Sequence, residues 1–97
     1  MTTRTALTKA KRGAAFLDEK LGRGWRRKIR RRELDLASPC NCIIGQLYGG
    51  EYNDGLEDLG IRVSNQGRQQ RLGFESDHRD YYDSLTDAWL EVLRGKA

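Results

Sequence analysis

The sequence predicts a small, mainly α-helical domain, and three observations lead to that prediction. The chain has 97 residues, about the length of one domain. Apolar residues recur at steps of three and four in several segments, and glycines follow those segments where helices would end. We therefore expect one bundle of about four helices, at about 5–21, 39–48, 52–59 and 77–93, with a polar loop and with frayed ends at 1–5 and 95–97.

The first helix is expected over residues 5–21. Its apolar residues recur at helical steps and comprise Leu7, Ala10, Ala14, Leu17 and Leu21. Gly22 suits the position just after the helix, while Gly13 weakens the middle by up to about 1 kcal/mol relative to alanine. Beyond the glycine, Trp25 and Ile29 stand four residues apart and can anchor a short basic helical stretch on the core.

Residues 34–36 alternate apolar and acidic side chains, which predicts a short extended connection. The second helix is expected over about 39–48, with Ser38 as its N-cap and Pro39 in its first turn. Cys42 points away from its apolar face, which comprises Cys40, Ile43, Ile44, Leu47 and Tyr48. A third, shorter helix is expected over about 52–59 and ends before Gly60.

Residues 61–74 are polar and lack a sustained period, so we expect a loop in which 61–63 and 72–74 form at most a small strand pair. The last helix, over about 77–93, is expected to be capped by Ser76 or Asp77. Its wide apolar stripe comprises Tyr81, Tyr82, Leu85, Ala88, Trp89, Val92 and Leu93. A domain of this size needs most of its large apolar side chains inside, so we expect Trp89, Leu85 and Tyr48 in the core.

Charge is divided unevenly along the chain. Residues 1–32 carry twelve Lys and Arg against two acids, whereas residues 33–97 carry six against twelve. Such asymmetry is typical of nucleic-acid or membrane-surface binding, or of one part of a molecule docking on an oppositely charged part. No stretch is apolar enough to span a membrane, and the first residues lack the layout of a secretory signal. We therefore expect a cytoplasmic protein without a membrane partner.

The basic run is the strongest functional signal, because Arg and Lys beside an aromatic ring can neutralise phosphates and stack on bases. The candidate nucleic-acid-binding residues are Arg23, Trp25, Arg26, Arg27, Lys28, Arg30, Arg31 and Arg32. The alternative interpretation is a solvated or internally paired face in which Trp25 belongs to the core. No zinc-finger, helix-turn-helix or RNP-type signature identifies a known reader fold, so the partner can be DNA or RNA.

Cys40, Cys42 and His78 are the candidates for a metal or redox site. A structural zinc site usually needs four ligands, however, and only three good ones are present. A Cys-x-Cys disulfide would close a very small ring, so we expect Cys40 to pack in the core and Cys42 to be a peripheral thiol. We expect neither a cofactor nor enzymatic activity, because the chain has no nucleophile elbow and no phosphate-binding glycine loop.

A set of short strings runs in order through residues 13–90: Gly13-Ala14-Ala15-Phe16-Leu17-Asp18-Glu19-Lys20, Gly24-Trp25, Leu34-Asp35-Leu36, Cys40, Cys42-Ile43-Ile44-Gly45-Gln46-Leu47-Tyr48-Gly49, Gly55-Leu56, Gly73-Phe74 and Leu85-Thr86-Asp87-Ala88-Trp89. In this set the chain resembles a group of small uncharacterised proteins of actinobacteria and their bacteriophages, which have no established activity. Several of those proteins have Cys-x-x-Cys where this chain has Cys-Asn-Cys, which argues against a shared metal or redox role. The resemblance implies a phage-type accessory protein acting in the cytoplasm of a bacterial host.

Three hypotheses follow from these observations. The first is a non-enzymatic accessory protein that binds nucleic acid without sequence preference through its basic N-terminal surface. The second is a protein-interaction module that binds a bacterial host protein or self-associates as a homo-oligomer, with aromatic contacts available from Tyr48, Tyr52, Tyr81, Tyr82 and Trp89. The third is a small metal-binding or redox protein that uses Cys40 and Cys42.

Overall fold

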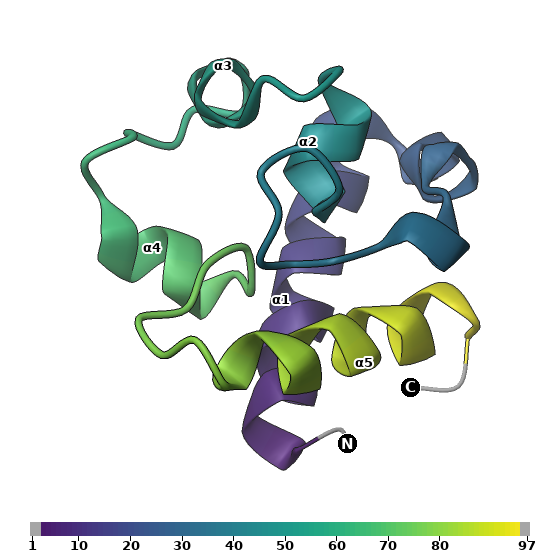
Figure 1. The fold of residues 1–97 in the computed structure, drawn as a ribbon. Coiled ribbons are helices and arrows are strands. Elements are labelled where there is room, and N and C mark those ends of the chain that lie inside the picture. Colours follow the sequence, from purple (N-terminus) through teal and green to yellow (C-terminus); the bar gives the residue numbers. More distant parts are fainter. Residues whose placement is uncertain (1–2, 96–97) are drawn as a thin grey trace.

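The computed structural model describes residues 3–95, which form five α-helices and two short 3₁₀-helices and contain no β-strand (Figure 1). In chain order the elements are α1 (Arg4–Leu21), the 3₁₀-helices η1 (Arg23–Lys28) and η2 (Arg31–Glu33), α2 (Ile43–Leu47), α3 (Tyr52–Asp58), α4 (Gln66–Arg71) and α5 (Tyr81–Leu93). The mainly helical prediction is confirmed. The number of helices is larger than expected, and the predicted strand pair at 61–63 and 72–74 is wrong.

The two longest helices cross at the centre of the molecule, where α5 lies over α1 (Figure 1). The face that α1 turns toward the core consists of small residues and one leucine: Ala6, Ala10, Gly13, Ala14 and Leu17. The buried residues of α5 are Leu85, Ala88, Trp89 and Val92. Small side chains on α1 allow the larger ones of α5 to approach its backbone, and close packing of this kind supplies most of the stability of short helices.

Trp89 occupies the crossing of the two helices and is fully buried. Its indole nitrogen donates a hydrogen bond of 2.7 Å to the carbonyl oxygen of Gly73. Its ring stacks on Phe74, with centroids 5.8 Å apart, and meets the edge of Trp25 at 6.2 Å. These contacts satisfy the one polar atom of the side chain and place three aromatic rings in a single cluster.

Gly13 lies against this cluster, in the middle of α1. A Cβ atom added here would lie 2.6 Å from the ring of Trp89 and would also collide with the carbonyl oxygen of Leu72. The sequence indicated only that glycine weakens the helix at this position. The structure shows that the missing side chain makes the space in which Trp89 packs.

The helix expected over 39–48 is shorter than predicted, and Ser38 is not its N-cap. Ser38 instead opens a turn, in which its side chain and backbone oxygens accept bonds from the amide of Asn41. The chain then folds back so closely that a Cβ at Gly45 would collide with the carbonyl oxygen of Pro39. Helix α2 begins only after this bend, with Cys42 at its N-cap.

The segment expected to be a loop contains the six-residue helix α4, capped by the side chain of Asn65. Its interior contact is a polar residue, Gln69, which is only 3% exposed. The side-chain amide of Gln69 donates to the carbonyl oxygens of Arg62, Val63 and Asn65 at 3.0–3.3 Å. It also accepts a hydrogen bond from the hydroxyl of Tyr52 at 3.1 Å. A buried polar residue with all these partners can replace an apolar one, because its hydrogen bonds offset its desolvation.

The last helix begins at Tyr81, four residues later than predicted, and neither Ser76 nor Asp77 caps it. Ser76 forms a local turn in which its hydroxyl accepts a bond from the amide of His78. The hydroxyl of Tyr82 bonds both the amide and the carbonyl of Ser76. This clamp holds residues 76–80 outside the helix.

The remaining expectations about buried residues and chain ends have mixed outcomes. Trp89 and Leu85 are core residues, as predicted, whereas Tyr48 is half-buried. The expected fraying at residues 1–2 and 96–97 lies outside the described residues, and α1 already includes Arg4 and Thr5. None of the helices within residues 3–95 combines the length and apolar character needed to cross a membrane.

The space around Gly13 gives a first prediction. Gly13→Ala should lower the free energy of unfolding by about 1–3 kcal/mol, the usual cost of overpacking a core. Gly67→Ala is the control, because Gly67 is also helical but its Cβ would meet only Asn65 Oδ1, at 3.8 Å. That variant should be neutral or more stable by up to about 1 kcal/mol. Urea denaturation measures both, and equal effects would contradict the packing role of Gly13.

Candidate nucleic-acid interface

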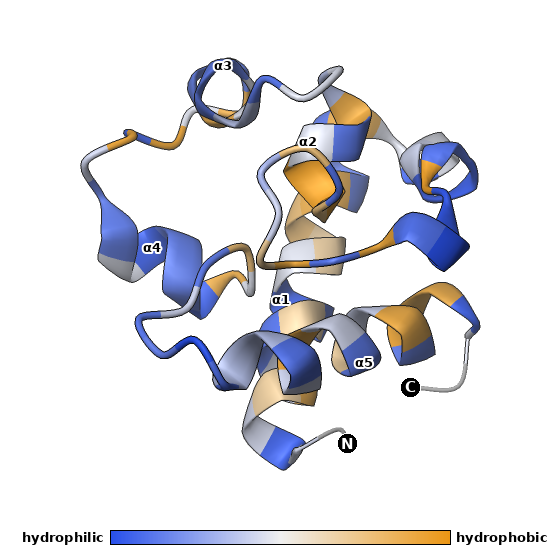
Figure 2. Ribbon diagram, viewed as in Figure 1, coloured by the Kyte–Doolittle hydropathy of each residue, from blue (hydrophilic) through white to orange (hydrophobic). Residues whose placement is uncertain are grey.

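The basic tract of the sequence folds as η1 and η2, on the flank of the molecule next to the C-terminal end of α1 (Figure 1). Figure 2 shows this edge as one of the most hydrophilic parts of the ribbon. Gly22 makes the tract possible, because its φ of 74° turns the chain sharply at the end of α1. Two apolar residues, Trp25 and Ile29, are buried and fix the tract on the core.

Trp25 is therefore a core residue and not a stacking residue. Its side chain is 2% exposed and packs edge-on against Trp89, and its indole nitrogen donates a 2.8 Å hydrogen bond to the carboxylate of Asp18. A ring in this position has no open face to offer a base. The inclusion of Trp25 among residues that contact nucleic acid is corrected accordingly, and its role is to anchor η1.

Asp18 receives a second partner from the tract, the guanidinium of Arg26. Two hydrogen bonds of 2.9 and 3.2 Å join the groups, and both side chains are 25% exposed. The Arg26 guanidinium holds the pKa of the Asp18 carboxyl below its usual range, and the bond from Trp25 acts in the same direction. The charge of Arg26 is thus largely matched within the molecule, and the pair fixes η1 on α1.

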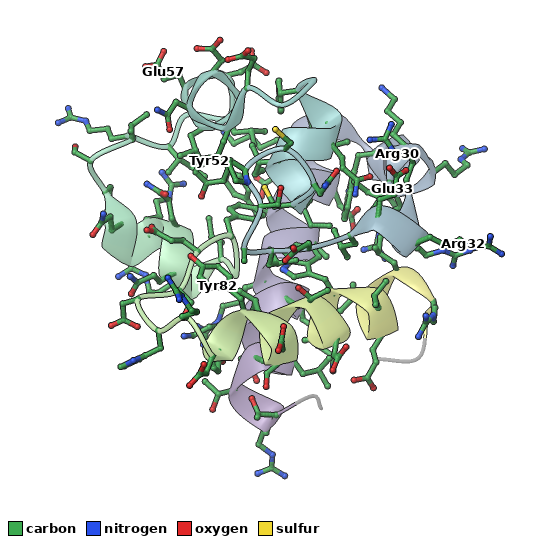
Figure 3. The ribbon with its side chains drawn as sticks, in the orientation of Figure 1. Arg30, Arg32, Glu33, Tyr52, Glu57 and Tyr82 are labelled. Carbon is green, nitrogen blue, oxygen red and sulfur yellow. The ribbon has the colours of Figure 1, made fainter. Side chains whose placement is uncertain are left out.

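Arg30 also makes contacts within the protein, through both its side chain and its backbone. Its guanidinium lies 2.8 Å from the carboxylate of Glu33 on the exposed surface (Figure 3). The side-chain amide of Gln46 in α2 accepts a bond from the backbone N–H of Arg30 and donates one to its carbonyl oxygen. Gln46 therefore holds the connection between η1 and η2 much as a neighbouring strand would.

The other basic side chains of the tract are exposed: Arg23, Arg27, Lys28, Arg31 and Arg32. Of these, Arg23 also helps to lower the pKa of the Asp18 carboxyl. Two hollows adjoin them. One, of about 380 Å³, is lined in part by Lys11 of α1, Arg23 and Arg26, with Asp18 as its one acid. The surface therefore extends from the tract onto the outer face of α1, and it contains more positive charge than the protein itself neutralises.

The second hollow, of about 330 Å³, brings Tyr48, which the sequence offered only as a core residue or as a contact for a protein partner, to the same side as Lys28. Tyr48 is half-buried, and its hydroxyl donates a 2.7 Å hydrogen bond to Asp58. Burial, reinforced by this carboxylate, raises the pKa of Tyr48 to about 12. Twenty positions separate Tyr48 from Lys28 in the sequence, so no local spacing indicates that they are neighbours.

The predicted places of the two cysteines are reversed in the structure. Cys42 is 2% exposed and its sulfur accepts a 3.2 Å hydrogen bond from the amide of Gly45, whereas Cys40 is exposed. The error follows from the shortened helix, because residues 39–42 form a turn and do not continue the face of α2. Burial raises the pKa of the Cys42 thiol, which makes it a poor nucleophile.

The structure does not bring the candidate metal ligands together. Cys42 lies beside α2, whereas His78 is exposed before α5 and faces Asp77 at 3.9 Å. Within residues 3–95 no three His, Cys, Asp or Glu side chains form a group that could hold a metal ion. These residues offer no support for the metal or redox hypothesis.

Comparisons with protein-family models, curated proteins and solved structures find no match to this chain. The resemblance to actinobacterial and phage proteins therefore stays an expectation.

The cysteine arrangement gives a second prediction. A thiol-reactive dye should label Cys40 at least about a hundredfold faster than Cys42, because a buried thiol reacts only when the structure opens. Cys40→Ser should abolish the fast phase and Cys42→Ser the slow one, as followed by absorbance. Two fast phases in the folded wild-type protein would show that Cys42 is not protected.

Proposed function

We propose that the protein binds nucleic acid without sequence preference, through the exposed cations of η1 and η2. One observation carries this proposal: five exposed basic side chains project from a backbone that Trp25 and Ile29 fix on the core. Cations held in this way can neutralise successive phosphates and release their counterions, which is the main source of sequence-independent affinity.

The geometry of the tract favours phosphate contacts over base recognition. Its two helices contain six and three residues, whereas proteins that read bases in the major groove usually insert a longer helix or a two-stranded ribbon. With Trp25 buried, the tract itself also lacks a stacking platform. We therefore expect affinity to depend on salt more than on sequence.

Acidic residues elsewhere orient the molecule on a polyanion. The exposed face of α3 carries Asp54 and Glu57. Figure 3 shows Glu57 and Arg32 at well-separated margins of the molecule. Repulsion from α3 and attraction by η1 and η2 act together, so that a nucleic acid approaches the basic side.

The test is a fluorescence-anisotropy titration with random-sequence DNA duplex, single strand and RNA at several salt concentrations. Arg31→Ala/Arg32→Ala should weaken binding about tenfold or more and reduce the slope of log K against log salt by about two, one for each lost phosphate contact.

The matched control is Arg62→Ala/Arg79→Ala, which removes the same charge from exposed positions outside the tract. It should change binding much less than the first pair. The proposal fails if the wild type does not bind any of the polymers at low salt, or if both double variants lose affinity equally.

A second candidate function, docking on a basic protein surface, is favoured by an acidic hollow next to η2. This hollow, of about 500 Å³, is lined by Leu34, Asp35, Asp83, Thr86 and Asp87. It lies beside the basic tract, so one copy can present its cations to the hollow of another. Such an arrangement would produce a homo-oligomer held by charge complementarity.

Asp35→Asn/Asp83→Asn should weaken this self-association, measured by sedimentation velocity, and added salt should weaken it further as the Debye length shortens. The control Asp54→Asn/Glu57→Gln removes the same amount of charge from α3 and should leave self-association unchanged. A wild-type protein that is monomeric at every salt concentration would rule out pairing between copies.

A further inference from the structure

A small pocket lies away from the basic tract, between residues 36–42, the start of α3, residues 74–75 and the start of α5. Its volume is about 160 Å³, and its principal lining residues are Leu36, Cys42, Tyr52, Phe74, Glu75 and Tyr82. Figure 3 shows Tyr52 and Tyr82 near the middle of the molecule, with Arg30 and Arg32 at its far edge. The lining contains no Lys, Arg or His.

Glu75 is the charged group of this pocket, and the protein leaves it incompletely satisfied. Its Oε2 atom is buried and has no hydrogen-bond partner among the described residues. Burial, together with the charge of Asp77, raises the pKa of the Glu75 carboxyl. Buried carboxylate oxygens are nearly always paired, so an unpaired one on a residue that lines a pocket marks a carboxyl group that a ligand can satisfy.

The two tyrosines form aromatic walls and do not supply the missing partner. The hydroxyl of Tyr52 donates to Gln69 Oε1, and that of Tyr82 donates to the carbonyl oxygen of Ser76 at 2.9 Å. Burial and the neighbouring acidic groups, Glu75 among them, raise the pKa of Tyr52. The pocket thus combines aromatic rings, apolar side chains and one unmatched acid, which together suit a cation carried on an apolar stem.

We propose that this pocket binds a primary ammonium group on a short alkyl chain, with the ammonium at Glu75 and the chain between Tyr52, Tyr82 and Phe74. A terminal rotation of the carboxyl group, which is a soft torsion, brings either oxygen to the ligand. The volume equals that of about five water molecules, which is room enough for an amine of about four carbons. The inference is independent of nucleic-acid binding, because it uses none of the basic residues.

The same chemistry can come from a free alkylamine or from a lysine side chain of a partner protein. Two probes distinguish these sources: n-butylammonium, and Nα-acetyl-lysine methylamide, which carries the same group on a peptide backbone. If the lysine derivative binds more tightly, the ligand is a protein side chain. If butylammonium binds and the derivative does not, the pocket takes free amines. If neither binds, the proposal is wrong.

The titrations are followed by amide and side-chain NMR, with n-butanol as an uncharged probe of similar shape. We expect shifts centred on Tyr52, Glu75 and Tyr82, and affinity for the cation at least about tenfold higher than for butanol, as expected of a charge-assisted hydrogen bond. Glu75→Gln keeps the shape and should reduce cation affinity about tenfold or more, while Glu57→Gln on the exposed face of α3 should not. Equal binding of butanol and the cation, or unchanged binding by folded Glu75→Gln, would overturn the proposal.

A second readout does not depend on how well the variant folds. In the wild-type protein, bound butylammonium should lower the pKa of the Glu75 carboxyl, measured by its ¹³C shift, because a neighbouring cation favours the charged form. A pKa that is unchanged at saturating amine would also overturn the proposal.

Discussion

The packing of Trp89 into the space left by Gly13 is the constraint on which the rest of the structure depends. Three separate parts of the chain meet this one ring: α1 through Gly13, the segment after α4 through Gly73 and Phe74, and η1 through Trp25. Because Trp25 is the anchor of the basic tract, the position of the surface cations follows from the aromatic cluster in the core. Core packing therefore holds the candidate interface in place, because η1 and η2 are too short to be stable alone.

Some cations of the basic tract form ion pairs within the protein, and the others are exposed on its surface. Arg26 and Arg30 are paired with Asp18 and Glu33, and the remaining cations of the tract carry like charges that repel one another. Burial of Trp25 and Ile29 offsets that repulsion, since apolar area removed from water is the main source of stability. The cations that destabilise the folded chain are also those left available to a polyanion, as is common where function and stability compete.

Sequence patterns predicted the parts of this molecule in which apolar residues keep a helical period. The stripes of α1 and α5 are long enough for that period to be unmistakable, and the basic residues of the interface are visible without any structure. Helix α4 was missed because a polar residue, Gln69, makes its interior contact. The burial of Cys40 and Cys42 was predicted the wrong way round, because residues 39–42 form a turn and the turn changes which side chain faces inward. The anchoring of Trp25 and Ile29 on the core followed from their spacing of four residues. The pocket of Glu75 depends on segments far apart in the chain, which no local pattern brings together.

The hydrogen bonds of Gln69 also determine which substitutions the neighbouring segment can tolerate during evolution. Its amide holds residues 62–65 by bonding their carbonyl oxygens, and it makes no use of their side chains. Every residue type has a carbonyl oxygen, so the link between α3 and α4 places little demand on which residues occupy it, Asn65 as the cap of α4 excepted. Sequence drift should therefore be tolerated at 62–64 and resisted at position 69, where only glutamine supplies both the reach and the paired donor and acceptor. A surface segment of this kind can acquire new side chains, and with them new contacts, without loss of the fold.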